Sequence, residues 1–172
     1  MPQPAGHPES VNSIARRGKA IGAIHDGVFP ILVHESVLEE ILAYSEQDVD
    51  RELGGFLTGA VFGGERKHVE ISHFLPAVDA HSKAASLTFT HDTWAAMTRE
   101  VGERYPEDVI AGWQHTHPGF GVFLSGYDLF IHRHFFNEPW QIAMVVDPRE
   151  REFGFFQWRG DQIVDCGFVC VK

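Results

Sequence analysis

The chain has 172 residues, and its 14 basic against 24 acidic side chains give a formal net charge of −10. This length allows one domain with its own core, and 44% hydrophobic and 22% charged residues exclude a disordered or collagen-like chain. The excess of acid argues against nucleic acid or anionic lipid, because Lys and Arg bind phosphate. No stretch reaches the roughly 18 apolar residues that a membrane helix needs. We therefore expect no nucleic-acid partner and no membrane association.

Residues 1–27 are rich in Pro, Gly, Ala and small polar side chains without a sustained period. This composition favours a flexible N-terminal leader before a domain at 28–172. A pair of arginines precedes a short apolar run here, as in twin-arginine export signals, but His25 and Asp26 interrupt the run. We therefore expect a cytoplasmic protein.

Strand and helix patterns alternate from residue 29 onward. Helical spacing and capping residues predict three helices, at 37–47 behind a Ser36–Glu39 capping box, between a cap at Asp92 and Tyr105, and at 126–136. Strands are expected at 29–33, 54–62, 69–75, 86–90, 109–115, 140–146, 153–159 and 163–171. The pattern predicts one α/β domain with a curved, mixed, mostly antiparallel sheet flanked by helices.

The two cysteines, Cys166 and Cys170, are too few for a disulfide framework. Both fall in the last expected strand, where a spacing of four keeps them too far apart to bond. We expect them to be reduced. The chain has 11 histidines, so metal chemistry would use imidazole and carboxylate rather than thiolate.

His115 and His117 stand at the end of an expected strand. Residues two apart on a strand share a face about 6–7 Å apart, so both imidazoles can converge on one ion through bonds of about 2.0–2.1 Å. Ser125 can cap the third helix, which places Asp128 in a first turn that points back to the strand end. Three such ligands leave a fourth position open, as in catalytic zinc sites. The alternatives are histidines satisfied by backbone and a plain helix cap.

A second His-x-His, His132 and His134, falls inside the third helix. Residues two apart on a helix point about 200° apart, so this pair cannot chelate one ion and is assigned to surface or core packing.

A zinc hydrolase also needs a base for the attacking water. Glu52 precedes the glycine-rich strand 54–62, where another backbone can approach closely. On local evidence alone, Glu52 fits a solvated loop carboxylate equally well, because three other acids precede it.

Together these residues resemble a known motif. Glu52 with Gly55 and Gly59, and His-x-His-Pro with seven residues before Ser-x-x-Asp, are similar to the JAMM motif of the MPN metalloprotease family. The similarity covers residues 29–156, and residues 112–125 resemble the eukaryotic deubiquitinating and deneddylating members. The resemblance implies a cytidine-deaminase-like α/β/α fold.

By the same resemblance, His115, His117 and Asp128 bind one Zn²⁺ with water as the fourth ligand. Glu52 is the general acid and base, and Ser125 stabilises the oxyanion. The implied reaction is hydrolysis of the isopeptide or peptide bond after the C-terminal glycine of ubiquitin or a ubiquitin-like protein.

The aromatic loop Phe120, Phe123 and Leu124 is expected to hold the extended tail of that substrate by strand addition. The segment 147–153 is short, so the long second insertion of linkage-specific deubiquitinases is not expected. The compact chain is more similar to prokaryotic members, some of which act beside conjugation-system enzymes.

Two other functions remain open. Some prokaryotic relatives are zinc peptidases that act on sulfur-carrier proteins, and members that lack the ligands serve as non-catalytic scaffold modules. A full set of ligands in this chain favours catalysis over the scaffold.

Overall fold

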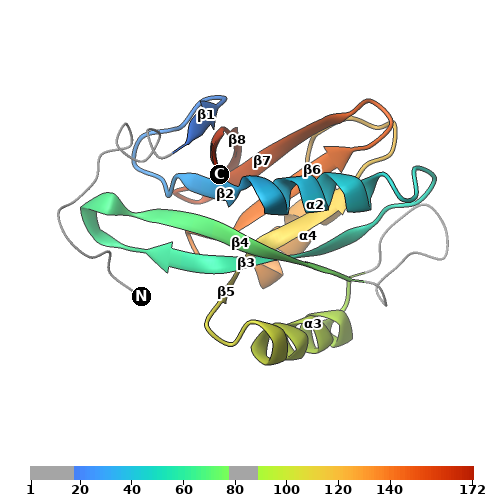
Figure 1. Cartoon of the computed structure of the whole chain (residues 1–172), viewed down its shortest axis with the longest axis horizontal. Helices are drawn as coiled ribbons and strands as arrows, with labels where there is room; N and C mark the ends of the chain where they lie inside the picture. The colour runs from blue at the N-terminus through green and yellow to red at the C-terminus, as the bar shows by residue number, and fades with distance from the viewer. Residues whose placement is uncertain (1–17, 78–88) are drawn as a thin grey trace.

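A computed structural model describes residues 18–77 and 89–172 of the chain (Figure 1). The strands are β1 (Lys19–Ile21), β2 (Ile31–His34), β3 (Gly54–Phe62), β4 (His68–Pro76), β5 (Val109–Thr116), β6 (Ile142–Asp147), β7 (Glu152–Arg159), β8 (Gln162–Cys166) and β9 (Phe168–Val171). The helices are α2 (Glu35–Ser45), α3 (His91–Arg104) and α4 (Gly126–Phe135), with a short 3-10 helix, η1 (Gly64–Arg66).

The nine strands of the described residues form one sheet, in the order β1-β9-β2-β4-β3-β5-β6-β7-β8. The pairs β2–β4, β2–β9 and β5–β6 are parallel and the others are antiparallel, which confirms the predicted mixed, mostly antiparallel sheet. The sheet is curled. This curl is evident from the rings of Phe155 on β7 and Phe168 on β9, which lie 4.9 Å apart although five strands separate β7 from β9 in the sheet order.

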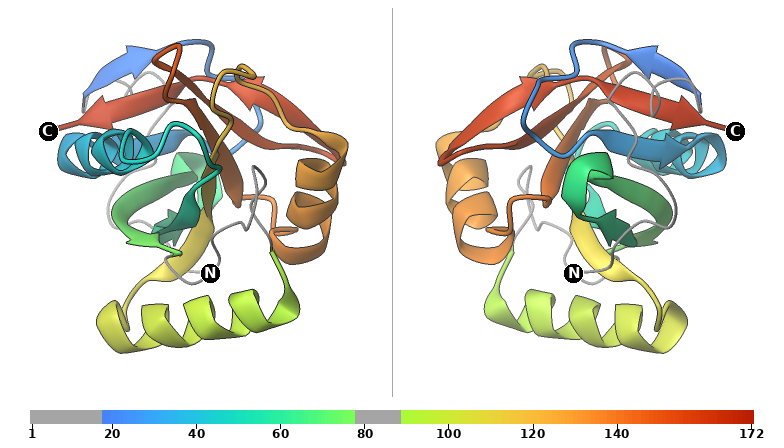
Figure 2. Two further views of the ribbon diagram at one scale, coloured as in Figure 1. Left: turned by 90° about the vertical axis from the view of Figure 1, so that its right-hand side faces the viewer. Right: turned by 90° about the vertical axis from the view of Figure 1, so that its left-hand side faces the viewer.

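Helices cover the sheet on two sides (Figure 2). Ile41 of α2 packs into a buried cluster with strand residues such as Ile71. Met97 of α3 and Ile131 of α4 pack with Phe56 in a second cluster. The central strands β3, β5 and β6 therefore lie between two apolar layers, and β5 and β6 are buried over most of their length. This burial holds in place the C-terminal end of β5, where His115 lies.

Two predicted caps are wrong. Helix α2 begins at Glu35, and its N-cap His34 makes no side-chain capping hydrogen bond, so Ser36 lies inside the helix. The reason is that β2 leads directly into α2 without a loop. Helix α3 is capped by Thr90, whose hydroxyl accepts from the Thr93 N–H, and Asp92 lies in the first turn.

The predicted strand 163–171 is two strands that separate at Gly167. β8 pairs with β7, whereas β9 pairs with β1 and β2 on the other side of the sheet. A Cβ at Gly167 would lie 2.4 Å from the Ile21 carbonyl oxygen, so the chain needs glycine where it changes sides. Cys166 and Cys170 are free thiols on different strands, which corrects the prediction that they share one.

The second part of the expected flexible leader belongs to the sheet, because Lys19–Ile21 form β1 and pair with β9. Of the predicted strand 86–90, residues 86–88 lie outside the described residues; Phe89 and Thr90 precede α3.

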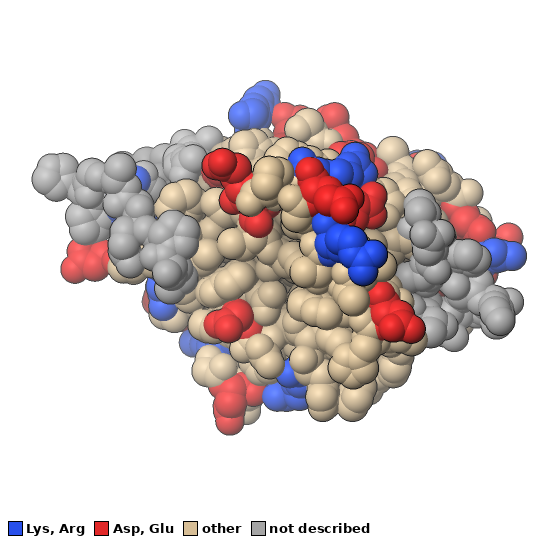
Figure 3. Space-filling model, turned by 90° about the horizontal axis from the view of Figure 1, so that it is seen from below, with Lys and Arg blue, Asp and Glu red and all other residues tan. Residues whose placement is uncertain are grey.

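No helix in the described part of the chain is long and apolar enough to cross a membrane. On the face shown in Figure 3, uncharged residues predominate and charged side chains lie in small groups of both signs.

Candidate metal centre

The two histidines of the motif meet at the end of β5. This strand is central, and His115 pairs with Gly54 of β3 on one side and Val145 of β6 on the other. His115 and His117 are 1% and 4% exposed, and their Nε2 atoms lie 3.1 Å apart. The strand spacing therefore brings both imidazoles to one point, as the sequence predicts.

Asp128 reaches this point from the first turn of α4. Ser125 is the N-cap, and its hydroxyl accepts from the Asp128 N–H at 3.1 Å while Asp128 Oδ2 accepts from the Ser125 N–H at 2.9 Å. The same Oδ2 atom lies 3.0 Å from Nε2 of both His115 and His117. The predicted cap and the predicted placement of Asp128 are both present.

The three converging atoms suit a single small cation. Bonds of about 2.0–2.1 Å in a tetrahedral site place ligand atoms about 3.3 Å apart, close to the observed triangle. Within the described residues, His115, His117 and Asp128 are the one group of three side chains spaced to hold a metal ion. Burial acts to raise the pKa of Asp128, but its contacts with the two histidines hold that pKa well below its usual range. Two imidazole nitrogens and one carboxylate are a donor set typical of zinc.

The imidazole of His117 is oriented by the loop that follows it. Its Nδ1 lies 3.2 Å from the Gly121 carbonyl oxygen, which can only accept, so Nδ1 donates a hydrogen bond there and Nε2 is the nitrogen turned toward Asp128. Burial acts to lower the pKa of His117, but the contact with Asp128 raises it, and the charge of Glu52 contributes in the same direction.

His115 is held by an aromatic neighbour. Its ring stacks on Trp113, with centroids 4.4 Å apart and planes 12° apart. Trp113 Nε1 in turn donates to Nδ1 of His132 at 2.9 Å. His132 is fully buried, and burial lowers its pKa to about 4, so it is a neutral acceptor at pH 7.

Glu52 lies beside His117 because of the register between β3 and β5. Gly54 pairs with His115, and Leu53 exchanges two hydrogen bonds with Thr116: the Thr116 N–H donates to the Leu53 carbonyl at 2.9 Å, and the Leu53 N–H donates to Thr116 Oγ1 at 2.8 Å. Just outside the two strands, Glu52 precedes Leu53 and His117 follows Thr116, so the same register brings these two residues near each other. The effect of the Glu52 charge on the pKa of His117 agrees with this placement.

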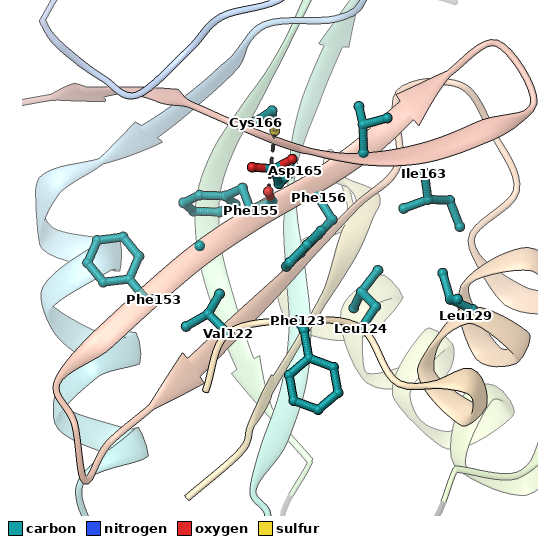
Figure 4. Close-up of a pocket in the computed structure, with 12 residues that line it drawn as sticks. Val122, Phe123, Leu124, Leu129, Phe153, Phe155, Phe156, Ile163, Asp165 and Cys166 are labelled. Carbon is teal, nitrogen blue, oxygen red and sulfur yellow. Dashed lines mark hydrogen bonds between the residues drawn. The ribbon is translucent and has the colours of Figure 1, made fainter. Parts of the chain in front are cut away.

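The aromatic loop lies along one side of the three ligands. Phe120 and Phe123 are 74% and 45% exposed, and the ring of Phe123 lies 4.8 Å from that of His117. Leu124 is partly buried and packs against the α3 and α4 side of the core. A groove of about 650 Å³ runs from Phe123 and Leu124 to β7 and β8, where Phe156 and Asp165 line it (Figure 4). Two of the three predicted loop residues are therefore exposed beside the candidate site.

Sequence reasoning missed Trp113 and Asp147, and it assigned His132, which is buried as one of the two packing roles expected for it, no part in supporting the site. Trp113 precedes His115 by two residues on the same strand face, and His132 follows Asp128 by about one helical turn, so spacing carried a signal for both. Asp147, at the end of β6, lies far from the motif in sequence, and nothing local indicates its role.

The comparison with protein families identifies this arrangement. Residues 26–138, more than half of the chain, match the family described as JAB1/Mov34/MPN/PAD-1 ubiquitin protease. The chain belongs to this family, and its fold is the MPN fold.

Several curated relatives are similar over part of their length. COP9 signalosome complex subunit 5 of Neurospora crassa is 50% identical over 99 residues, which cover 56% of this chain and 29% of that protein. The 26S proteasome regulatory subunit RPN11 of Eremothecium gossypii is 27% identical over 143 residues, 78% of this chain and 45% of that protein. The NAD(+) hydrolase TcpA of a Theionarchaea archaeon is 29% identical over 104 residues, 60% of this chain and 29% of that protein. The chain thus spans less than half of each of these relatives.

A solved structure has the same fold. Protein DSY2949 from Desulfitobacterium hafniense superposes with a TM-score of 0.63 over 83% of this chain and 93% of that one. The sequence identity is 19%, so this likeness concerns the fold alone.

Proposed function

We propose that this protein is a zinc-dependent isopeptidase or peptidase that hydrolyses the bond after the C-terminal glycine of a ubiquitin-like protein in the cytoplasm. The observation that carries the proposal is the buried triangle of His115, His117 and Asp128 with Glu52 beside it. Membership of the family and the similarity to RPN11 and COP9 signalosome subunit 5 support it.

His115, His117 and Asp128 would hold the zinc ion, which supplies Lewis acidity to the scissile carbonyl and lowers the pKa of the attacking water. Glu52 takes the proton from that water and delivers it to the leaving amine. The Ser125 hydroxyl accepts from the Asp128 N–H, which leaves its own hydrogen for donation to the oxyanion. Trp113 and the Gly121 carbonyl keep both imidazoles in place.

The test of this chemistry is Glu52→Gln, which keeps the shape of the side chain and removes the base. We expect the variant to retain stoichiometric zinc and to lose about 10²–10⁴-fold in cleavage of a ubiquitin-like fusion or conjugate. Glu46→Gln is a matched control, since Glu46 is an exposed acid at the end of α2 in the same connection. Cleavage by Glu52→Gln at the wild-type rate would contradict the assignment of the base.

The aromatic loop is proposed to bind the extended tail that leads to the cleaved bond. Phe120→Ala and Phe123→Ala should each raise KM about fivefold, because each removes apolar area from the bound tail, and should leave zinc in place. Phe130→Ala is the control: Phe130 is 52% exposed, and its ring packs on His134 of the same helix rather than on a candidate ligand. An unchanged KM in both loop variants would exclude this role.

A zinc peptidase that acts on a sulfur-carrier protein would use the same residues, so the substrate panel should include such a carrier beside ubiquitin-like precursors and conjugates. A scaffold without catalysis would leave all of them intact even with zinc bound.

A further inference from the structure

The turn between β6 and β7 begins with a buried carboxylate that binds four backbone N–H groups. Asp147 is fully buried, and its Oδ1 accepts from Gly119 at 2.8 Å, Arg149 at 3.1 Å and Glu150 at 3.2 Å. Its Oδ2 accepts from Gly121 at 2.9 Å. Burial acts to raise the pKa of Asp147, but these four hydrogen bonds outweigh it and lower that pKa, so the group is a carboxylate at neutral pH.

Two of these N–H groups belong to the loop that orients His117. Gly119 and Gly121 have φ of 79° and 88°, a conformation in which glycine is favoured. The Gly121 residue that donates to Asp147 also accepts from His117 Nδ1 through its carbonyl. A continuous chain of hydrogen bonds therefore runs from Asp147 through Gly121 to His117.

The same turn also reaches the segment that carries Glu52. Arg149 Nε donates to the Val49 carbonyl at 2.8 Å, and its Nη2 donates to Asp50 Oδ1 at 2.7 Å. The Arg149 side chain crosses close to Gly119, since a Cβ there would lie 3.3 Å from Arg149 Cδ. One turn thus touches the connections before Glu52 and after His117, which are far apart in sequence.

We propose that the β6–β7 turn is a positioning element of this site. In it, Asp147 fixes the orientation of the His117 imidazole, and Arg149 fixes the position of the segment that carries Glu52. What the aligned groups catalyse rests on the proposed isopeptidase function. The positioning itself does not, so it is measured by zinc affinity and amide exchange as well as by cleavage.

The first arm of the test is Asp147→Asn. An amide offers one acceptor oxygen and turns an NH₂ group toward backbone N–H donors, so the loop loses its anchor. Zinc affinity, measured by competition with a chelator, should fall about tenfold, the low end of the range for groups that orient a metal ligand. The Gly119 and Gly121 amides should exchange faster with deuterium. Glu150→Gln removes the same charge from the same turn and should change neither quantity.

Gly121→Ala gives a second route to the same result if Asp147→Asn does not fold. An alanine Cβ meets nothing within 4 Å there, so the change acts through the backbone, where φ of 88° is unfavourable for alanine. Zinc affinity should again fall about tenfold, since the Gly121 carbonyl moves away from His117. The Asp147 carboxylate itself is unchanged in this variant.

The second arm is Arg149→Ala, with Arg149→Lys as the conservative variant. Displacement of the segment before Glu52 should lower kcat about fivefold, with KM and zinc affinity unchanged. Deuterium exchange should rise in residues 48–53 and stay unchanged at Gly119 and Gly121. The kcat of Arg149→Lys should lie between those of wild type and Arg149→Ala, because a single ammonium replaces two separate donors. Arg159→Ala, an exposed arginine at the end of β7, is the control and should match wild type.

Wild-type zinc affinity and wild-type exchange at Gly119 and Gly121 in Asp147→Asn would overturn the first arm. Equal rises in exchange in both segments of Arg149→Ala would overturn the second, since they would show general loosening. If wild-type protein cleaves no ubiquitin-like substrate, the proposed function fails, whereas the zinc and exchange results still decide the positioning.

Discussion

Two histidine–aspartate clusters lie at opposite ends of β5 and have different structures. At the C-terminal end, His115 and His117 both lie 3.0 Å from Asp128 Oδ2. Before the N-terminal end, His73 Nδ1 of β4 lies 2.6 Å from Asp108 Oδ2. Both clusters join a strand histidine to an aspartate outside the strands, so this contact alone does not define a metal site.

The difference lies in how many potential metal-ligand atoms converge and in how deeply these side chains are buried. Asp108 Oδ2 accepts from the Thr58 hydroxyl at 2.8 Å as well as from His73, so each contact there joins a donor to the carboxylate. The His73 side chain is 43% exposed, and its ring stacks on Tyr105 at 4.0 Å. In the other cluster, Nδ1 of His117 is hydrogen-bonded to the Gly121 carbonyl, and Nε2 of both histidines lies against one carboxylate oxygen, with side chains only 2–9% exposed. Three side-chain atoms that can each ligate a cation therefore converge in this cluster, whereas His73 and Asp108 offer only two.

The largest expected effect comes from replacing one histidine in each cluster with glutamine. His117→Gln removes a candidate ligand and should lower zinc affinity by more than about 100-fold. His73→Gln should leave zinc binding unchanged. The measurement is bound zinc per chain after dialysis, with the thermal midpoint as a folding control. Equal zinc loss in both variants would show that the comparison is wrong.

A smaller effect is expected from His132, the buried neutral neighbour of Trp113, on the pH dependence of the free energy of unfolding. Its pKa is about 4 in the folded protein and about 6.5 when unfolded. As pH falls from 6.5 toward 4, only the unfolded chain takes up this proton, so the free energy of unfolding falls by up to about 1.4 kcal/mol per pH unit. His132→Gln keeps an acceptor for Trp113 and removes this titration.

The measurement is the thermal midpoint of both proteins between pH 7 and pH 5, with a chelator present so that zinc loss does not contribute. The wild-type curve should fall more steeply with acid than the variant curve. Parallel curves would show that His132 does not titrate as its burial implies. The two proteins differ only at residue 132, so the difference between their curves reports this residue.

Sequence was sufficient where the determinants are local. His115 and His117 are two residues apart on one strand, and Ser125 and Asp128 form a cap within one helical turn, so spacing alone predicts their placement. Strand β3 has the bounds 54–62 that the sequence predicts. These features depend on backbone geometry over a few residues.

Sequence was insufficient where distant segments decide the outcome. Residues 163–171 form an apolar run that a single strand would explain, and only the curl of the sheet divides it at Gly167. Asp147 satisfies N–H groups of a loop 26 and 28 residues earlier in the chain, which no local pattern indicates. Helix α2 needs no side-chain cap because β2 leads into it, so the Ser36 signal was misleading.

The smallest predicted effect concerns the Thr58 hydroxyl at the other cluster. Thr58 is fully buried, and Thr58→Val removes its hydrogen bond to Asp108 at nearly constant volume. The free energy of unfolding should fall by about 1 kcal/mol, a shift of about 2–4 °C in the thermal midpoint for a chain of this size. Zinc affinity should not change, because Asp108 precedes the first residue of β5, whereas His115 and His117 lie at its other end. A loss of zinc affinity would show that β3 and β5 couple the two clusters, and the comparison would then describe one extended site rather than two separate clusters.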